Sequence, residues 1–222
     1  MGWQNLPMTA KRPTPAAVTG QYLRLEPLTA DDLPELFPAI AHPVIFAGGF
    51  GGGPRGYRDT EAGFVEWGKR YYDWDGGNIY GTRLIGGDAD GLLVGASTLG
   101  DFDVANEHAH IGWTAFDPRV WGSAVNPEAK LLMLGIAFDS GFGRVKIQAD
   151  VLNERSRAAI AGIGATFEGI VRRDRIRADG TWRDSAVFSV IVEEWPDVRA
   201  NLERRLAGFE GKPVVLRERR LS

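Results

Sequence analysis

Small residues at the joint between a predicted strand and a predicted helix are the first feature of the sequence that could do chemistry. The joint lies within residues 117–130 and contains Gly122, Ser123 and Ala124. The first backbone N–H groups of a helix have no intrahelical partners and carry partial positive charge. Small side chains leave these groups open to an anion, so the joint is a candidate phosphate site. The alternative is an ordinary tight turn with a helix cap.

Two histidines just before this joint could move a proton. His108 and His110 are two positions apart, so on a strand they project to the same face, whereas Glu107 projects to the other. An unperturbed histidine has a pKa of roughly 6.5, which suits it to accept a proton near neutral pH. The alternative is that both histidines only line the surface of a sheet.

The composition excludes several kinds of chemistry. The chain has 222 residues and no cysteine, which removes disulfides, thiolate metal sites and a cysteine nucleophile. A net charge of −3 gives no basic field for a nucleic-acid partner. No run of 18 apolar residues predicts a membrane span, and the N-terminus lacks the apolar core of a signal peptide, so we expect a cytoplasmic protein.

Alternating strand and helix patterns predict one α+β domain. Residues 1–19 are expected to form a flexible arm, residues 20–207 the domain and residues 208–222 a solvated tail. Strands and helices interleave, and hairpins on both sides of the central segment favour a mixed sheet. The predicted strands are 21–28, 78–85, 91–99, 108–116, 144–151, 167–176 and 185–195, and the predicted helices are 29–40, 59–72, 126–140, 153–164 and 195–208.

Two local features of this layout are an expected helix cap and a glycine-rich stretch. Asn126 is expected to cap the helix at 126–140, with Pro127 at its first position. Residues 47–56 include six glycines but lack the Lys-Ser/Thr pair of a phosphate loop, and Pro54 interrupts them. This stretch therefore indicates a mobile surface loop.

Four motifs in order resemble one enzyme superfamily. Arg119-x-x-Gly122-x-Ala124 matches the pyrophosphate signature R/Q-x-x-G-x-G/A of the GNAT acetyltransferases. "NERS" at 153–156, "GATFEG" and a hairpin ending in "DSAVFSVIVEEW" follow. Together they resemble the ribosomal-protein N-acetyltransferase branch of that superfamily, over about residues 20 to 200 and most strongly over 110–195.

The resemblance implies a GNAT fold, with a central, splayed mixed sheet of about seven strands and helices on both faces. Acetyl-CoA would lie in a V between strands 108–116 and 144–151, with its phosphates on the joint. Alignment on "PEA" at 127–129 moves the signature two residues on, to Trp121-x-x-Ala124-x-Asn126, and leaves the role of Arg119 open. The implied cofactor-binding residues are Trp113, Thr114, Arg119, Trp121, Gly122, Ser123, Ala124, Val125, Asn126, Asn153 and Ser156.

The implied reaction is direct attack of a neutral amine on the thioester, with acetyl-CoA as the acyl donor and no metal. Ser156 would assist the leaving thiolate, and a first-turn helix residue is the alternative. Asn153 would bind the pantetheine chain or serve as a plain N-cap. His110 occupies the position where relatives often carry the base, and water is the alternative proton carrier.

An aromatic group is the candidate acceptor site, although aromatic residues at helical spacing are more often core. Its members, with one histidine, are Trp67, Tyr71, Trp74, Tyr80 and His108. The resemblance implies an N-acetyltransferase that acts on a protein N-terminus or a small amine. The alternative is a non-catalytic acyl-CoA-binding regulatory module. The oligomeric state stays open, with a homodimer among the alternatives.

Overall fold

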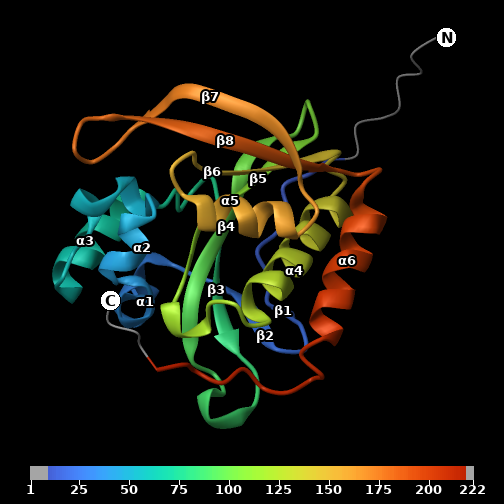
Figure 1. Cartoon of the computed structure of the whole chain (residues 1–222), viewed down its shortest axis with the longest axis horizontal. Coiled ribbons are helices and arrows are strands. Elements are labelled where there is room, and N and C mark those ends of the chain that lie inside the picture. Colours follow the sequence, from blue (N-terminus) through green and yellow to red (C-terminus); the bar gives the residue numbers. More distant parts are fainter. Residues whose placement is uncertain (1–9, 219–222) are drawn as a thin grey trace.

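One eight-stranded sheet organises the protein. The computed structural model describes residues 10–218, and its strands lie in the order β1-β2-β3-β4-β5-β6-β8-β7 (Figure 1). Among the strands of this described part, only β5 and β6 pair in parallel, so the sheet is mixed, as predicted. The strands are β1 (Val18–Thr19), β2 (Leu23–Pro27), β3 (Asn78–Leu84), β4 (Leu93–Asp103), β5 (His108–Phe116), β6 (Arg144–Asp150), β7 (Thr166–Ile176) and β8 (Trp182–Ile191).

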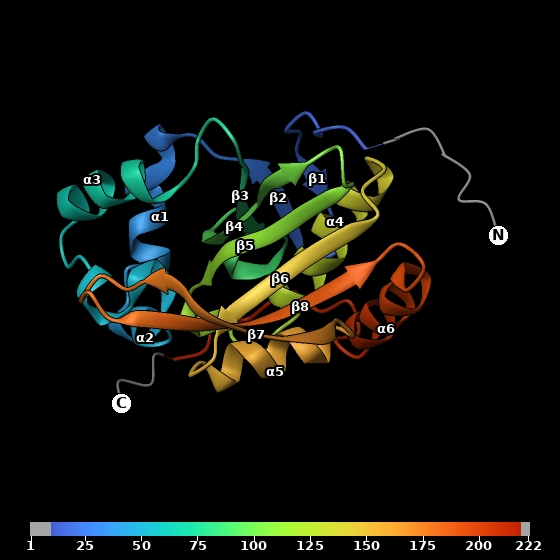
Figure 2. The same cartoon turned by 90° about the horizontal axis from the view of Figure 1, so that it is seen from above.

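The sheet opens between β5 and β6. The parallel ladder of β5 and β6 runs from His108 opposite Arg144 only to Ile111 opposite Ile147, although β5 continues to Phe116. On the other edge of β5, the pairing with β4 shifts register near Trp113, whose φ of 50° marks a bulge. The predicted V between these strands is confirmed, and the strands can be followed in Figure 2.

Helices cover both faces of the sheet and enclose two apolar cores. Helices α1 and α3 pack on one face, around Phe64 and Ile79. Helices α4, α5 and α6 pack on the other, around Met133 and Val145 (Figures 1 and 2). The helices are α1 (Leu33–Ile40), α2 (Pro43–Ala47), α3 (Glu61–Tyr71), α4 (Val125–Asp139), α5 (Glu154–Gly162) and α6 (Trp195–Ala207).

Helix α4 begins one residue earlier than predicted, at Val125. The N–H of Val125 donates to Ser123 Oγ at 3.3 Å, so Ser123 supplies the first-turn acceptor and Asn126 is not the cap. Pro127 lies at the third helical position instead of the first. It fits there because the N–H groups of a first turn need no intrahelical acceptor.

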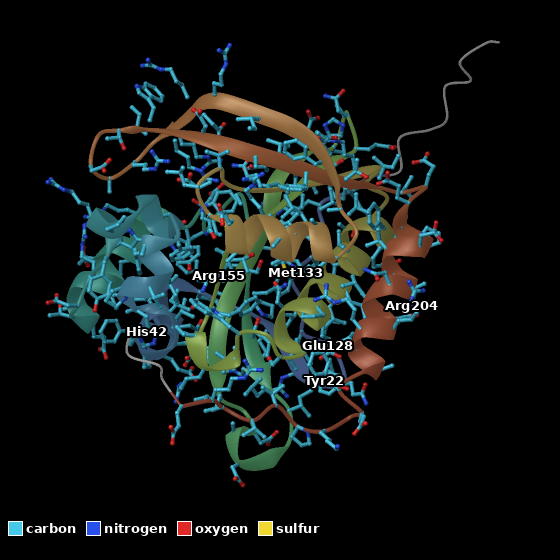
Figure 3. All side chains as sticks on the ribbon, in the orientation of Figure 1. Tyr22, His42, Glu128, Met133, Arg155 and Arg204 are labelled. Atoms are coloured by element: carbon cyan, nitrogen blue, oxygen red, sulfur yellow. The ribbon has the colours of Figure 1, made fainter. Side chains whose placement is uncertain are left out.

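A buried carboxylate fixes α4 against β2. Glu128 is 3% exposed and accepts hydrogen bonds from the backbone N–H groups of Gln21, Tyr22 and Leu23 at 2.7 to 2.8 Å (Figure 3). A Cβ atom on Gly20 would lie 2.5 Å from this carboxyl group, so only glycine fits there. The start of α4 is therefore held rigidly, which matters for the site built on it.

The interpretation of residues 47–56 as a mobile surface loop is wrong. Gly51 and Gly56 are buried, and a Cβ on Gly56 would lie 2.1 Å from the carbonyl oxygen of Gly51. The Gly51 N–H donates to Tyr71 Oη at 3.2 Å, and the carbonyl of Gly52 accepts from Ala178 at 2.9 Å. The glycines thus permit close backbone packing between α3 and the β7–β8 hairpin.

Both described ends of the chain are packed on the domain. In the segment expected to be an arm, Ala10 is buried and Arg12 donates to the carbonyl of Asp75 at 2.7 Å. In the tail, Val214 is buried and the Arg217 N–H donates to the carbonyl of Arg119 at 3.1 Å. The rest of both predictions, for residues 1–9 and 219–222, lies outside the described residues. Within residues 10–218, no helix is long and apolar enough to cross a membrane.

Candidate active site

Three cavities meet where β5 and β6 separate. The outer cavity, about 370 Å³, lies at the N-terminus of α4 and beside α5. The inner cavity, about 120 Å³, lies between the splayed strands and shares Thr114, Asn126 and Ser156 with the outer cavity. The far-face cavity, about 70 Å³, shares Gly112, Trp113 and Gln148 with the inner cavity. A ligand can therefore enter the gap in the sheet from either side.

The outer cavity is suited to an anion. Gly122 has a φ of +75°, the left-handed region, and it lies in the wall just before α4. Within residues 10–218, no residue accepts a hydrogen bond from the backbone N–H of Gly122 or Asn126. The Arg155 guanidinium lies 3.3 Å from the centroid of the Trp121 ring, and burial lowers its pKa (Figure 3). Arg205 lines the same cavity, which adds a second positive charge.

Most residues predicted to bind the cofactor line the outer cavity. Arg119 does not, because its guanidinium is paired with the buried Asp117 at 2.6 Å and holds the turn before α4. Ala124 is 1% exposed and lies behind the wall. The predicted residues that do line the cavity are Thr114, Trp121, Gly122, Ser123, Val125, Asn126, Asn153 and Ser156. Trp113 lines the inner cavity.

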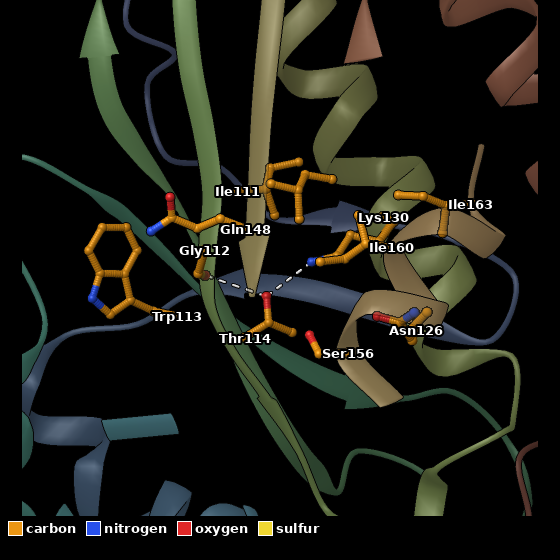
Figure 4. Close-up of a pocket in the computed structure, with 12 residues that line it drawn as sticks. Ile111, Gly112, Trp113, Thr114, Asn126, Lys130, Gln148, Ser156, Ile160 and Ile163 are labelled. Carbon is orange, nitrogen blue, oxygen red and sulfur yellow. Dashed lines mark hydrogen bonds between the residues drawn. The ribbon is translucent and has the colours of Figure 1, made fainter. Parts of the chain in front are cut away.

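Helix α5 presents Ser156 to both the outer and the inner cavities. Its backbone N–H donates to Asn153 Oδ1 at 2.9 Å, so Asn153 is the N-cap of α5. The Asn153 side-chain amide also donates to the carbonyl of Gly48. Both ends of the Asn153 side chain are thus engaged within the protein, whereas the Ser156 hydroxyl faces the cavities (Figure 4).

A buried lysine occupies the inner cavity. Lys130 is 4% exposed, and its Nζ donates to Thr114 Oγ1 at 3.0 Å (Figure 4). Thr114 Oγ1 lies 2.6 Å from Ser97 Oγ and 3.4 Å from the Gly112 carbonyl, so the three polar groups form one network behind the bulge. Burial lowers the pKa of Lys130 to about 7. An amine that is half protonated near neutral pH therefore borders the gap.

A histidine–aspartate pair borders the far-face cavity. His110 Nδ1 lies 2.8 Å from Asp101 Oδ2, and His110 is 3% exposed. Burial lowers the pKa of His110, and the hydrogen bond from His110 holds the pKa of Asp101 below its usual value. A neutral ring that donates from Nδ1 leaves the lone pair of Nε2 free. Nε2 is buried, has no hydrogen-bond partner within the described part of the chain, and packs against Gly112.

Of the residues predicted to form the acceptor site, only Tyr71 lines the far-face cavity. Trp67 lies behind Tyr71, with the two rings stacked at 4.4 Å between centroids, and Trp74 packs on Tyr72. Tyr80 is 1% exposed in the core on the opposite face of the sheet. His108 lies at the start of the β5–β6 ladder and lines none of the three cavities.

Several residues at the site were missed from the sequence. Lys130 lies three and four residues before the buried Met133 and Leu134, so it shares their apolar helix face. A charged residue on that face could have been recognised from the sequence. Arg155 lies inside the "NERS" motif. The others come from distant strands, and no local pattern brings them to one cavity: Asp101, Gln148, Arg175 and Arg183.

A family model described as an acetyltransferase (GNAT) domain matches residues 22–166. A Bacillus subtilis protein named "Putative ribosomal N-acetyltransferase YdaF" is 32% identical over 144 residues, which span 63% of this chain and 71% of the relative.

Solved structures share the fold. A GCN5-related N-acetyltransferase from Brucella melitensis superposes with a TM-score of 0.79 at 29% identity, covering 92% of this chain and 90% of that one. The microcin C7 self-immunity acetyltransferase MccE, solved in complex with acetyl-CoA and AMP, superposes with a TM-score of 0.63 at 18% identity, covering 78% and 94%. The latter likeness concerns the fold alone.

Proposed function

The chain belongs to the acetyltransferase (GNAT) family, in its ribosomal N-acetyltransferase-like branch, and is an acyltransferase; from this premise we propose that it moves an acetyl group from acetyl-CoA to a primary amine in a ternary complex. The observation that carries the proposal is the row of three cavities, in which the inner cavity shares lining residues with both the outer and the far-face cavity. Donor and acceptor can approach one another from opposite faces of the sheet. Acetyl-CoA supplies the activated acetyl group.

The outer cavity fits the phosphates of CoA. The N–H groups of Gly122 and Asn126 can donate to an anion in this cavity without an intervening side chain. The start of α4 adds partial positive charge. Arg155 and Arg205 line the same cavity and supply full positive charges. Arg155 stacked on Trp121 forms a flat, cationic surface, which suits an adenosine diphosphate.

The inner cavity fits the reacting end of the donor. Trp113 and Thr114 have no pairing partner in the register of either neighbouring strand, so their N–H groups can donate to an oxyanion that forms in the gap. Ser156 donates a hydrogen bond to the leaving thiolate. Lys130 in its protonated form lowers the cost of negative charge in the same small space.

His110 serves as the base in this proposal. Its free Nε2 accepts a proton from the acceptor amine at the far-face cavity, and Asp101 holds the ring through Nδ1 and stabilises the imidazolium that results. A lowered pKa keeps His110 neutral, and hence able to accept, at and above neutral pH. The acceptor is a protein N-terminus or a small amine.

Turnover assays test the proposal directly. Free thiol released from acetyl-CoA should rise in proportion to the acetylated amine, measured by mass spectrometry, across a panel of peptides and small amines. The Gly122→Asp variant, which places a carboxylate at the phosphates, should lose both signals. Binding of acetyl-CoA with no turnover against any amine would instead support a regulatory acyl-CoA-binding module.

A further inference from the structure

Two arginines lie directly opposite each other beside the far-face cavity. Arg175 on β7 and Arg183 on β8 are register partners in the antiparallel hairpin, and both line the cavity. Like charges placed opposite each other on neighbouring strands destabilise a sheet. The repulsion is relieved when an anion lies between them.

Arg183 is the less compensated of the two. Its Nε is buried and has no hydrogen-bond partner within residues 10–218, and no carboxylate there lies within 4.0 Å of its guanidinium. The two acids near it are already engaged. Asp150 is paired with Arg177 at 2.7 Å, and Asp174 accepts from Ser185 Oγ at 2.7 Å and lies 3.7 Å from Arg175.

The remaining groups around the far-face cavity favour the same kind of ligand. Among residues 10–218, no acidic residue lines it; Asp101 lies behind the His110 ring. The Tyr71 hydroxyl accepts from the Gly51 N–H, which leaves its own proton available to a ligand. Gln148 adds a side-chain amide at the opening to the inner cavity.

We propose that the far-face cavity binds an anionic group of the acceptor, so that the acceptor is an amine with a carboxylate or phosphate a few bonds away. This rests on the proposed acetyl transfer and names its substrate class. Arg175 and Arg183 bind the anion, since guanidinium groups match the geometry of carboxylate and phosphate oxygens. The amine then lies at the gap, between His110 and the inner cavity, and the small volume of the far-face cavity selects a compact anionic group.

Matched acceptors test this. Tripeptide amides that begin with Asp or Asn form the carboxylate pair, and those that begin with phosphoserine or Ser form the phosphate pair. The anionic member of at least one pair should show a kcat/KM at least tenfold higher than its neutral counterpart. In Arg183→Gln that ratio should fall towards one, and Arg183→Lys should retain part of it. Arg173→Gln is the matched control, because Arg173 lies on the same hairpin but packs on Trp182 outside the cavity.

A binding measurement separates this proposal from the acetyl transfer itself. With CoA saturating the outer cavity, inorganic phosphate should raise the melting temperature of the wild type above that in chloride at equal ionic strength. The rise should vanish in Arg183→Gln and persist in Arg173→Gln. Equal kcat/KM within both pairs, or the same phosphate effect in all three proteins, would overturn the anionic acceptor while leaving acetyl transfer intact. Loss of CoA binding in the wild type would count against the proposed function instead.

Discussion

Replacing Lys130 with methionine should abolish a pH dependence of stability that this residue imposes on the fold. An unperturbed lysine has a pKa of 10.5, and burial lowers the pKa of Lys130 to about 7. Between these values the unfolded chain binds a proton that the folded chain does not, so the free energy of unfolding rises with pH. Below about pH 7 both states are protonated and the contribution is constant. Linkage gives a gain of roughly 2 kcal/mol between about pH 7 and pH 9.

Urea unfolding of the ligand-free protein at several pH values measures this gain. The difference in free energy of unfolding, wild type minus Lys130→Met, should increase by about 2 kcal/mol from pH 7 to pH 9. All other titrating groups are common to both proteins and cancel in this difference. Lys69→Met is the control, since Lys69 is an exposed lysine on α3 and its loss should leave the slope unchanged. If the free energies of unfolding of wild type and Lys130→Met changed in parallel with pH, burial would not lower the pKa of Lys130, and the reasoning would be refuted.

Two further predictions concern turnover. His110→Ala should lower kcat by roughly 10²-fold or more and remove the acidic limb of the pH–rate profile, because that limb reports protonation of the base. Asp101→Asn should move the same limb while the affinity for acetyl-CoA stays constant. Unchanged pH–rate profiles in both variants would leave water as the proton carrier. Ser156→Ala should lower turnover while the affinity for acetyl-CoA stays unchanged within a few-fold. Its thermal stability should match that of the wild type, because Asn153 and not the Ser156 hydroxyl caps α5. A loss of stability without a kinetic effect would assign Ser156 a structural role.

Local sequence patterns predicted most of the fold, because the strands and helices follow clear periodicities. The joint before α4 was recognised from its small residues, and it does form a wall of the outer cavity. The glycine-rich stretch was misread because its function is close packing: glycines that let backbones touch have the same composition as a mobile loop. The motif match left the role of Arg119 open, because it does not reveal that Asp117, two residues away, pairs with the Arg119 guanidinium.

Most of the lining of the far-face cavity could not be predicted, because its residues come from five elements that are distant in the sequence. Tyr71, His110 and Gln148 lie on α3, β5 and β6, and Arg175 and Arg183 meet them only through the register of the β7–β8 hairpin. The aromatic cluster around Trp67 was a plausible pocket by composition, yet its rings fill the space under α3. Only the tertiary structure separates a lining residue from the one stacked behind it.

Calorimetric titration of CoA into the wild type, Gly122→Asn and Gly122→Asp tests the central claim most directly. Gly122 has a φ of +75°, which asparagine and aspartate tolerate better than other side chains, so the two variants are matched in backbone strain and volume and differ in one charge. If the phosphates of CoA lie on this joint, Gly122→Asn should keep measurable affinity and Gly122→Asp should lose it, with both proteins folded. Equal affinity of the two variants for CoA would contradict the placement of the donor in the outer cavity.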